Sequence, residues 1–215
     1  MTLYKSIRYI LVIAAIFWLV MGFQLISHLD LSSFGIYPRT QDGLYGILAA
    51  PFLHANLEHL ISNTVPFIVL GTAIAFFYRR IALLVMLFVY LGTGLAVWLL
   101  ARSSYHIGAS GVVYGFASFL FFAGVFRRDI KSLSIALIVV FLYGGLVYGI
   151  LPLYKGVSWE SHLFGAIMGG IAAYLFRNFK DSNENQQKSM PDFDDYKTGY
   201  RNIETNAYKY QHKKY

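Results

Sequence analysis

Five polar residues that could take part in catalysis are spread through a chain made mostly of long apolar runs. They are His54, His59, Asn63, Ser110 and His162. A serine hydroxyl is a weak nucleophile until a base removes its proton. Imidazole, with an unperturbed pKa near 6.5, suits that task at neutral pH. The pattern predicts acyl transfer, with Ser110 as the nucleophile and His162 as the general base.

Acyl transfer also requires hydrogen-bond donors aimed at the oxygen that becomes negatively charged. His59 and Asn63 are four residues apart, so they share one face of a helix. Together with the backbone amide of Ser110 they predict an oxyanion hole. Gly108 and Gly111 flank the serine and carry no side chain that would block a substrate.

An acidic third member of the catalytic group is absent from the pattern. The acidic residues expected at the same end of the predicted helices as Ser110 and His162 are Asp30, Asp42, Glu58 and Glu160. None of them lies deep in an apolar run. Glu160 is two residues before His162 and therefore faces another side of the helix. We expect it to act as a favourable charge at a helix N-terminus. The sequence predicts a Ser–His dyad.

A metal site is the rival use of the histidines, and the sequence argues against it. The five-residue separation of His54 and His59 does not place both on one helix face, and the H-E-x-x-H motif is absent. The chain has no cysteine, which excludes thiolate ligands and disulfides. We predict no metal and no cofactor, and expect His54 to support the structure. His28, His106 and His212 fall in predicted linkers or the tail and are assigned no role.

The apolar runs that must position these residues are long enough to cross a membrane. Hydrophobic residues make up 57% of the 215 residues and charged residues 13%, too few to cover a soluble domain. A span needs about 20 apolar residues. Six helices are predicted, at about 7–27, 57–78, 81–101, 108–126, 132–151 and 159–177. The expected fold is all-α, a polytopic six-helix bundle.

The depth of the polar residues is set by the direction of the helices. The second, fourth and sixth predicted helices run the same way, so the residues in their first turns share one level. Gly111 and Gly115 on the fourth helix, and Gly165 and Gly169 on the sixth, form small-xxx-small patterns that let two membrane helices touch. Such contact would bring Ser110 within hydrogen-bond reach of His162.

The basic residues predict the orientation of the bundle. Fifteen of the 18 lysines and arginines lie on one side of the predicted spans, so both termini are expected in the cytoplasm. This distribution accounts for the net charge of +7 without nucleic acid. Residues 1–178 are expected to form the membrane domain, with the first run as a retained anchor. Residues 179–215 are predicted to form a polar, disordered cytoplasmic tail. An apolar stretch at 43–52, in the external linker, is expected to be an interfacial or partly embedded loop.

At these positions the chain resembles the rhomboid family of intramembrane serine proteases. The resemblance covers about residues 7–178 and rests on three motifs. They are H-x₄-H-x₃-N at His54, His59 and Asn63, G-x-S-G at 108–111, and H-x₂-G-x₃-G from His162 through Gly165 to Gly169.

The resemblance implies a six-helix bundle with a hydrated, outward-open cavity, in which transmembrane proteins are cut near the outer face of a bacterial cell membrane. It assigns Ser110 as nucleophile and His162 as base, and it matches Tyr114 to a tyrosine that stacks on the catalytic histidine. It implies that His59 and Asn63 stabilise the oxyanion, and that the fourth helix is short and central. One departure is Tyr37-Pro38-Arg39, where some members carry a Trp-Arg pair.

Two alternatives to proteolysis stay open at this point. One is a catalytically inactive rhomboid-like protein that binds or dislocates membrane clients; such relatives usually lack the serine or the histidine. The other is a transporter or proton relay that uses the histidines, which the lack of intramembrane acids disfavours. The expected partners are transmembrane substrates and the lipid bilayer. The sequence names neither the substrate nor the oligomeric state.

Overall fold

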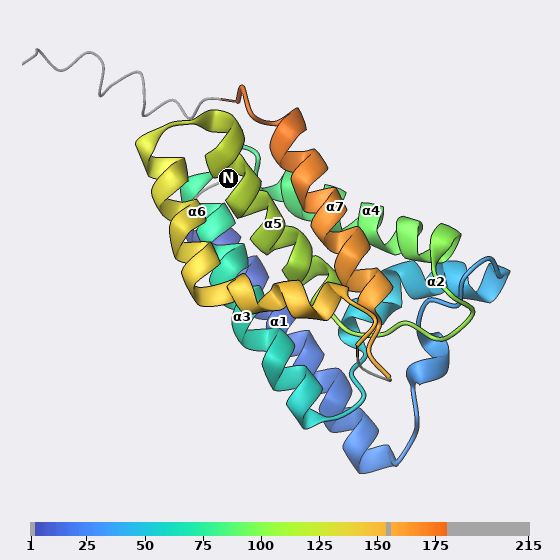
Figure 1. The fold of residues 1–215 in the computed structure, drawn as a ribbon. Helices are drawn as coiled ribbons and strands as arrows, with labels where there is room; N and C mark the ends of the chain where they lie inside the picture. Colours follow the sequence, from blue (N-terminus) through green and yellow to red (C-terminus); the bar gives the residue numbers. More distant parts are fainter. Residues whose placement is uncertain (1–2, 154–155, 180–215) are drawn as a thin grey trace, which may run out of the picture. The chain divides into compact units, whose positions relative to one another are not determined.

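The computed structural model describes residues 3–153 and 156–179, and that part of the chain is helical (Figure 1). The α-helices are α1 Leu3–Ser27, α2 Gln41–Ala49, α3 Leu57–Phe77, α4 Ala82–Leu100, α5 Ser110–Arg127, α6 Ile130–Tyr143 and α7 Trp159–Leu175. Short 3₁₀ helices lie at η1 Ser32–Phe34, η2 Ala50–Phe52 and η3 Gly144–Ile150. In the described residues the extended backbone pairs at one isolated β-bridge, between Ile36 and His106. The prediction of an all-α fold is confirmed. The predicted tail lies outside the described residues, apart from Phe179.

Five stretches are long and apolar enough to cross a membrane. They are Ile7–Ser27, Leu57–Phe77, Ala82–Leu100, Ser110–Arg127 and Ile130–Ile150. The sixth expected span is α7, which has 17 residues and is shorter than these five. A count of six crossings therefore stays a prediction.

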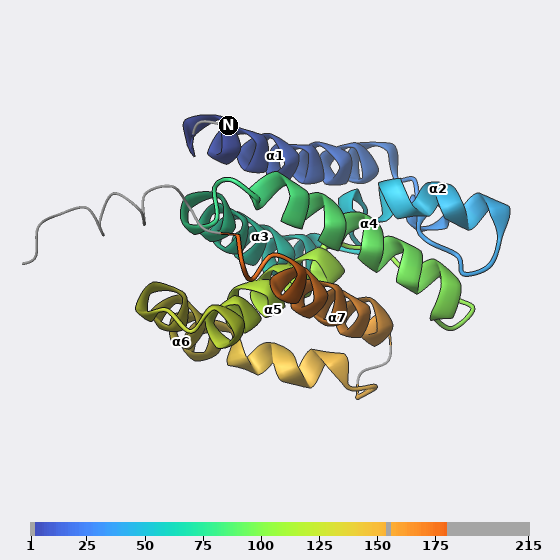
Figure 2. The same ribbon diagram turned by 90° about the horizontal axis from the view of Figure 1, so that it is seen from above.

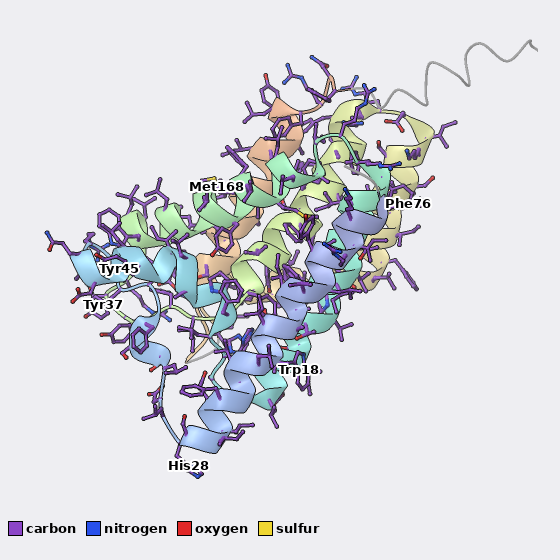
Figure 3. All side chains as sticks on the ribbon, turned by 180° about the vertical axis from the view of Figure 1, so that it is seen from behind. Trp18, His28, Tyr37, Tyr45, Phe76 and Met168 are labelled. Atoms are coloured by element: carbon purple, nitrogen blue, oxygen red, sulfur yellow. The ribbon has the colours of Figure 1, made fainter. Side chains whose placement is uncertain are left out.

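The outward faces of the bundle carry many large apolar side chains, which would be unfavourable in contact with water. Trp18 of α1 is 45% exposed and Phe76 of α3 is 56% exposed (Figure 3), and Phe141 of α6 is 88% exposed. Large continuous apolar surface of this kind marks contact with lipid. The chain is an integral membrane protein.

Helix α5 lies at the centre of the bundle. It packs against α3, α4, α6 and α7, and Figure 2 shows it between the outer helices. Most of its side chains from Gly111 to Gly124 are buried. Helix α1 packs on α3 at the edge. The first residue of α5, Ser110, therefore starts a helix that is enclosed on several sides.

The segment 43–52, expected to be an interfacial or partly embedded loop, is instead helical, in α2 and η2. The expectation of a loop was wrong, and its depth in the membrane stays a prediction. Thr40 caps α2 by accepting a hydrogen bond from the amide of Gly43 at 3.1 Å, the usual signal for a helix start. Two side chains of α4 tie α2 down. The Trp98 indole donates to the Thr40 carbonyl at 2.8 Å, and the Tyr90 hydroxyl donates to the Leu48 carbonyl at 2.6 Å. Helix α2 is a short, capped element packed on α4.

The predicted helix at 132–151 changes type before its end. Helix α6 stops at Tyr143, and the tighter η3 continues from Gly144 to Ile150. Two consecutive glycines, Gly144 and Gly145, mark the change, because glycine is a poor α-helix former. The η3 segment then packs against α7, which brings its backbone close to His162.

Candidate active site

Ser110 and His162 meet at the same end of two parallel helices. Ser110 is the first residue of α5 and His162 lies in the first turn of α7. The Ser110 Oγ and His162 Nε2 atoms are 2.8 Å apart. His162 is buried and Ser110 is half-buried, so the pair is shielded from bulk solvent and still accessible from one side.

Glycine contacts hold α5 and α7 close enough for this bond. A Cβ atom on Gly165 would overlap the Gly111 carbonyl, and one on Gly169 would overlap the Gly115 carbonyl. On the other helix, a Cβ on Gly111 would lie 2.9 Å from the Ser161 carbonyl oxygen. Only hydrogen side chains allow the backbones to approach in this way. The two small-xxx-small patterns thus face each other.

The His162 ring is oriented by a backbone carbonyl of η3. Its Nδ1 lies 2.8 Å from the Gly149 carbonyl oxygen. Because a carbonyl only accepts hydrogen bonds, Nδ1 must carry the proton and donate it. Nε2 is then unprotonated and accepts from the Ser110 hydroxyl. This is the tautomer that a general base needs. The carbonyl that sets it could not be identified from the sequence.

Tyr114 fixes the plane of the same ring. Its ring stacks on His162 with centroids 4.1 Å apart and an interplanar angle of 4°. The Tyr114 hydroxyl closely approaches the Gly149 backbone, where a Cβ would collide with it. The imidazole is therefore held by stacking on one side and by the η3 backbone at its edge.

His59 presents an N–H group beside the serine. Its Nδ1 accepts a hydrogen bond from the Ala55 amide at 3.4 Å, which assigns the ring proton to Nε2. A Cβ on Gly108 would lie 2.7 Å from that Nε2, so the ring rests on the loop that precedes Ser110. Gly108 has φ +103° and donates to the Ala50 carbonyl at 2.8 Å. Both its backbone angle and its neighbour require glycine.

Asn63 lies one turn further along α3 and is buried. Its side-chain amide donates to the His59 carbonyl at 2.7 Å. An amide nitrogen has two hydrogens, so one remains for another acceptor. The Ser110 amide belongs to the first turn of α5, whose N–H groups have no partner within the helix. The structure thus places donors from α3 and α5 at one end of the bundle.

His54 lies in the loop before α3 and is almost fully buried. Its ring packs against Phe17, with centroids 5.5 Å apart, and edge-on against His59 at 5.1 Å. Burial, together with the neighbouring His59, lowers the pKa of His54 to about 4. The ring is neutral at pH 7 and supports His59 from behind.

His106, to which the sequence assigned no role, is also a buried structural residue. Its Nε2 lies 3.1 Å from the Arg102 carbonyl and its Nδ1 2.6 Å from the Ser158 hydroxyl, which in turn lies 2.6 Å from the Ser161 hydroxyl. Glu160 pairs with Arg102 at 3.5 Å. These contacts fasten the N-terminal end of α7, and Glu160 does not contact His162 through any of them.

Comparison with known proteins identifies the fold family. A model of the Rhomboid domain matches residues 41–179. An uncharacterised protein of Mycobacterium tuberculosis is 38% identical, over 77% of this chain and 73% of its own length. A Bacillus subtilis protein provisionally named a rhomboid protease is 25% identical over 80% of this chain and 89% of its own. The chloroplast rhomboid-like protein 11 of Arabidopsis thaliana is 26% identical over 80% of this chain and 68% of its own. The chain belongs to the rhomboid family.

Proposed function

We propose that this chain is an intramembrane serine endopeptidase that cuts the transmembrane segments of other membrane proteins. The observation that supports it most is the bond between Ser110 and the unprotonated Nε2 of His162, with Nδ1 held by the Gly149 carbonyl. A serine paired to a base that a third group orients is the arrangement that nucleophilic catalysis requires. Here the third group is a backbone carbonyl.

The proposed reaction has two acyl-transfer steps. Ser110 Oγ attacks the scissile carbonyl while His162 Nε2 takes the hydroxyl proton. The negative charge on the carbonyl oxygen is stabilised by the Ser110 amide, His59 Nε2 and Asn63. His162 then gives its proton to the leaving amine, and an acyl-enzyme ester forms. Water, deprotonated by His162, attacks that ester, and the serine leaves with a proton from His162.

The proposed site lies near the outer face of a bacterial cell membrane. The excess of basic residues at the opposite end of the bundle supports this orientation, and the mycobacterial relatives support the bacterial setting. The α3, α5 and α7 N-termini then share the outer level. A substrate helix must unwind there, because helical hydrogen bonds shield its peptide bonds.

A fluorophosphonate probe tests the proposal directly. We expect the detergent-solubilised protein to be labelled, and the variants Ser110→Ala and His162→Ala to be unlabelled. The matched control is Ser118→Ala, because Ser118 lies on the same helix and donates to the Ala166 carbonyl at 2.6 Å. Ser118→Ala should label as the wild type does.

The same variants, tested on a model transmembrane substrate, separate the proposal from its alternative. Proteolysis predicts a product that disappears in Ser110→Ala and persists in Ser118→Ala. Binding of the substrate by the wild type with no Ser110-dependent product would instead indicate an inactive, client-binding protein.

A further inference from the structure

An apolar groove runs between α1 and α4 on the side of the bundle away from α6 and α7. Its volume is about 420 Å³. Residues of five elements line it: α1, η2, α3, α4 and α5 together with its N-cap. Its lining includes Tyr9, Ile13, Ala82, Tyr90, Ala109 and Val112.

The groove lies between α1 and α4, which run in the same general direction and diverge along their length (Figures 1 and 2). Its α1 residues extend from Tyr9 to Phe17, and its α4 residues extend over the same distance from Ala82 to Tyr90. At 1.5 Å per residue, eight residues cover about 12 Å of the apolar layer. A slot of this length accommodates part of an extended hydrocarbon chain that lies along α1.

Water is a poor occupant of this space. The lining is almost wholly hydrocarbon and aromatic, and a buried water needs two to four polar partners. The side chains of the described residues leave the volume open between two helices that face lipid. An apolar occupant from the bilayer is therefore favoured.

Basic residues gather at one end of the groove. Lys5 is four residues before Tyr9 and shares its face of α1. The Arg8 guanidinium lies 5.8 Å from the centroid of the Tyr9 ring. Arg79 and Arg80 form the turn just before Ala82. This end is the one that the charge distribution places in the cytoplasm. Basic pockets between membrane helices on that side attract anionic lipid head groups.

We propose that the groove binds one anionic phospholipid, with an acyl chain between α1 and α4 and its phosphate at the Lys5 and Arg8 end. The groove also reaches Ala109, which directly precedes Ser110, and Val112, which lies in the first turn of α5. The bound acyl chain packs against the first turn of α5. The proposal concerns binding and does not depend on proteolysis.

A phosphatidylglycerol with a photoreactive group at the end of one acyl chain tests the site. In nanodiscs of phosphatidylcholine we expect the label on the peptides containing residues 9–17 and 82–90. Unlabelled phosphatidylglycerol should compete, and added phosphatidylcholine should not. Labelling spread evenly over all lipid-facing helices would overturn the proposal, as would equal competition by both lipids. Crosslinks to a second copy of the chain in place of lipid would also overturn it.

Two variants with matched controls test the binding of the acyl chain and of the head group separately. Lipid affinity is measured by native mass spectrometry with added phosphatidylglycerol. Ile13→Trp fills the groove and should lower affinity about tenfold or more. Val12→Trp, on the adjacent 50% exposed position of α1, should not. Arg8→Gln should lower affinity about fivefold, and Lys131→Gln, in the first turn of α6, should leave it unchanged. Equal effects within either pair would contradict the site.

Discussion

The residue that orients the proposed base contributes no side chain. Gly149 holds the Nδ1 proton of His162 through its carbonyl oxygen, and its lack of a Cβ makes room for the Tyr114 hydroxyl. The orientation of the imidazole thus depends on where the η3 backbone runs. Small displacements of a catalytic group can cost about 10²-fold in rate, so this position is open to a sharp test.

We predict that Gly149→Ala lowers the rate of fluorophosphonate labelling by about tenfold to a hundredfold, because its Cβ would collide with the Tyr114 hydroxyl. The matched control is Gly145→Ala in the same η3, where a Cβ would meet nothing within 4 Å. Adding Tyr114→Phe to Gly149→Ala should restore part of the rate by removing the colliding atom. Equal rates for the two single variants would show that the carbonyl does not matter.

A substitution at Gly108 tests the role of His59 as an oxyanion donor. Gly108→Ala should displace the His59 ring and lower kcat/KM for a model substrate by about 10²–10³, the usual cost of losing one donor. Gly156→Ala separates this effect from backbone strain. Gly156 also has a positive φ, +83°, but its Cβ would meet nothing within 4 Å. A comparable loss of activity in both variants would assign the effect to strain.

Sequence reasoning could propose these side chains but not the main-chain atoms around them. Serine, histidine and asparagine are rare inside apolar runs, so Ser110 and His162 are conspicuous. Every residue has a carbonyl, and nothing in the sequence distinguishes that of Gly149. His106 was overlooked for a related reason, because its partner Ser158 is 52 residues away and only the fold brings them together.

At the scale of elements, the pairing of α5 with α7 sets the distance between Ser110 and His162. Gly165→Ala should force the two helices apart at the Gly111 carbonyl and destabilise the protein by about 1–3 kcal/mol, as overpacking usually does. The labelling rate of the protein that remains folded should also decrease, because Ser110 and His162 are held further apart. Gly170→Ala is the control, since its Cβ would make ordinary contact with Phe122 at 3.4 Å. Thermal unfolding in detergent, with labelling of the folded fraction, measures both effects.

The elements differed in how well the sequence predicted them. The starts of α3 and α7 were found to the residue, because long apolar runs begin there after a polar linker. Helix α2 was mistaken for a loop because the apolar stretch at 43–52 is too short to cross a membrane. Its two glycines, Gly43 and Gly46, also lower its intrinsic helix propensity. Both are buried, where they let α2 lie against the preceding loop. Contacts with α4 outweigh its low intrinsic helix propensity.

For the whole molecule, the buried His54 makes stability depend on pH. Its pKa is about 4 in the folded chain, against the ordinary 6.5. The unfolded chain therefore binds more protons between these values, and stability falls as the pH drops from 6.5 toward 4. The unfolding midpoint in detergent should decline over that window. In His54→Phe the unfolding midpoint should decline less steeply with falling pH, whatever its value at pH 7. An unchanged pH dependence would show that His54 is not responsible.

The orientation of the molecule can be measured with single cysteines, because the natural chain has none. In intact bacterial cells, a membrane-impermeant maleimide should label Ser33→Cys, in the loop after α1, and should not label Lys131→Cys, at the start of α6. Both positions are exposed. Permeabilised cells should label both, which controls for reactivity. The reverse pattern in intact cells would invert the proposed topology.

The carbonyl of Gly149 has one consequence for how such sites evolve and are copied. A carboxylate in its place would be traceable in any sequence comparison, and it would bring a charge that the membrane penalises. A main-chain carbonyl leaves no trace in a sequence comparison and brings no charge into the membrane. The orienting group can therefore be inherited through any substitutions that preserve the path of the backbone. A designer who transplanted only the serine and the histidine onto another helical bundle would leave it behind.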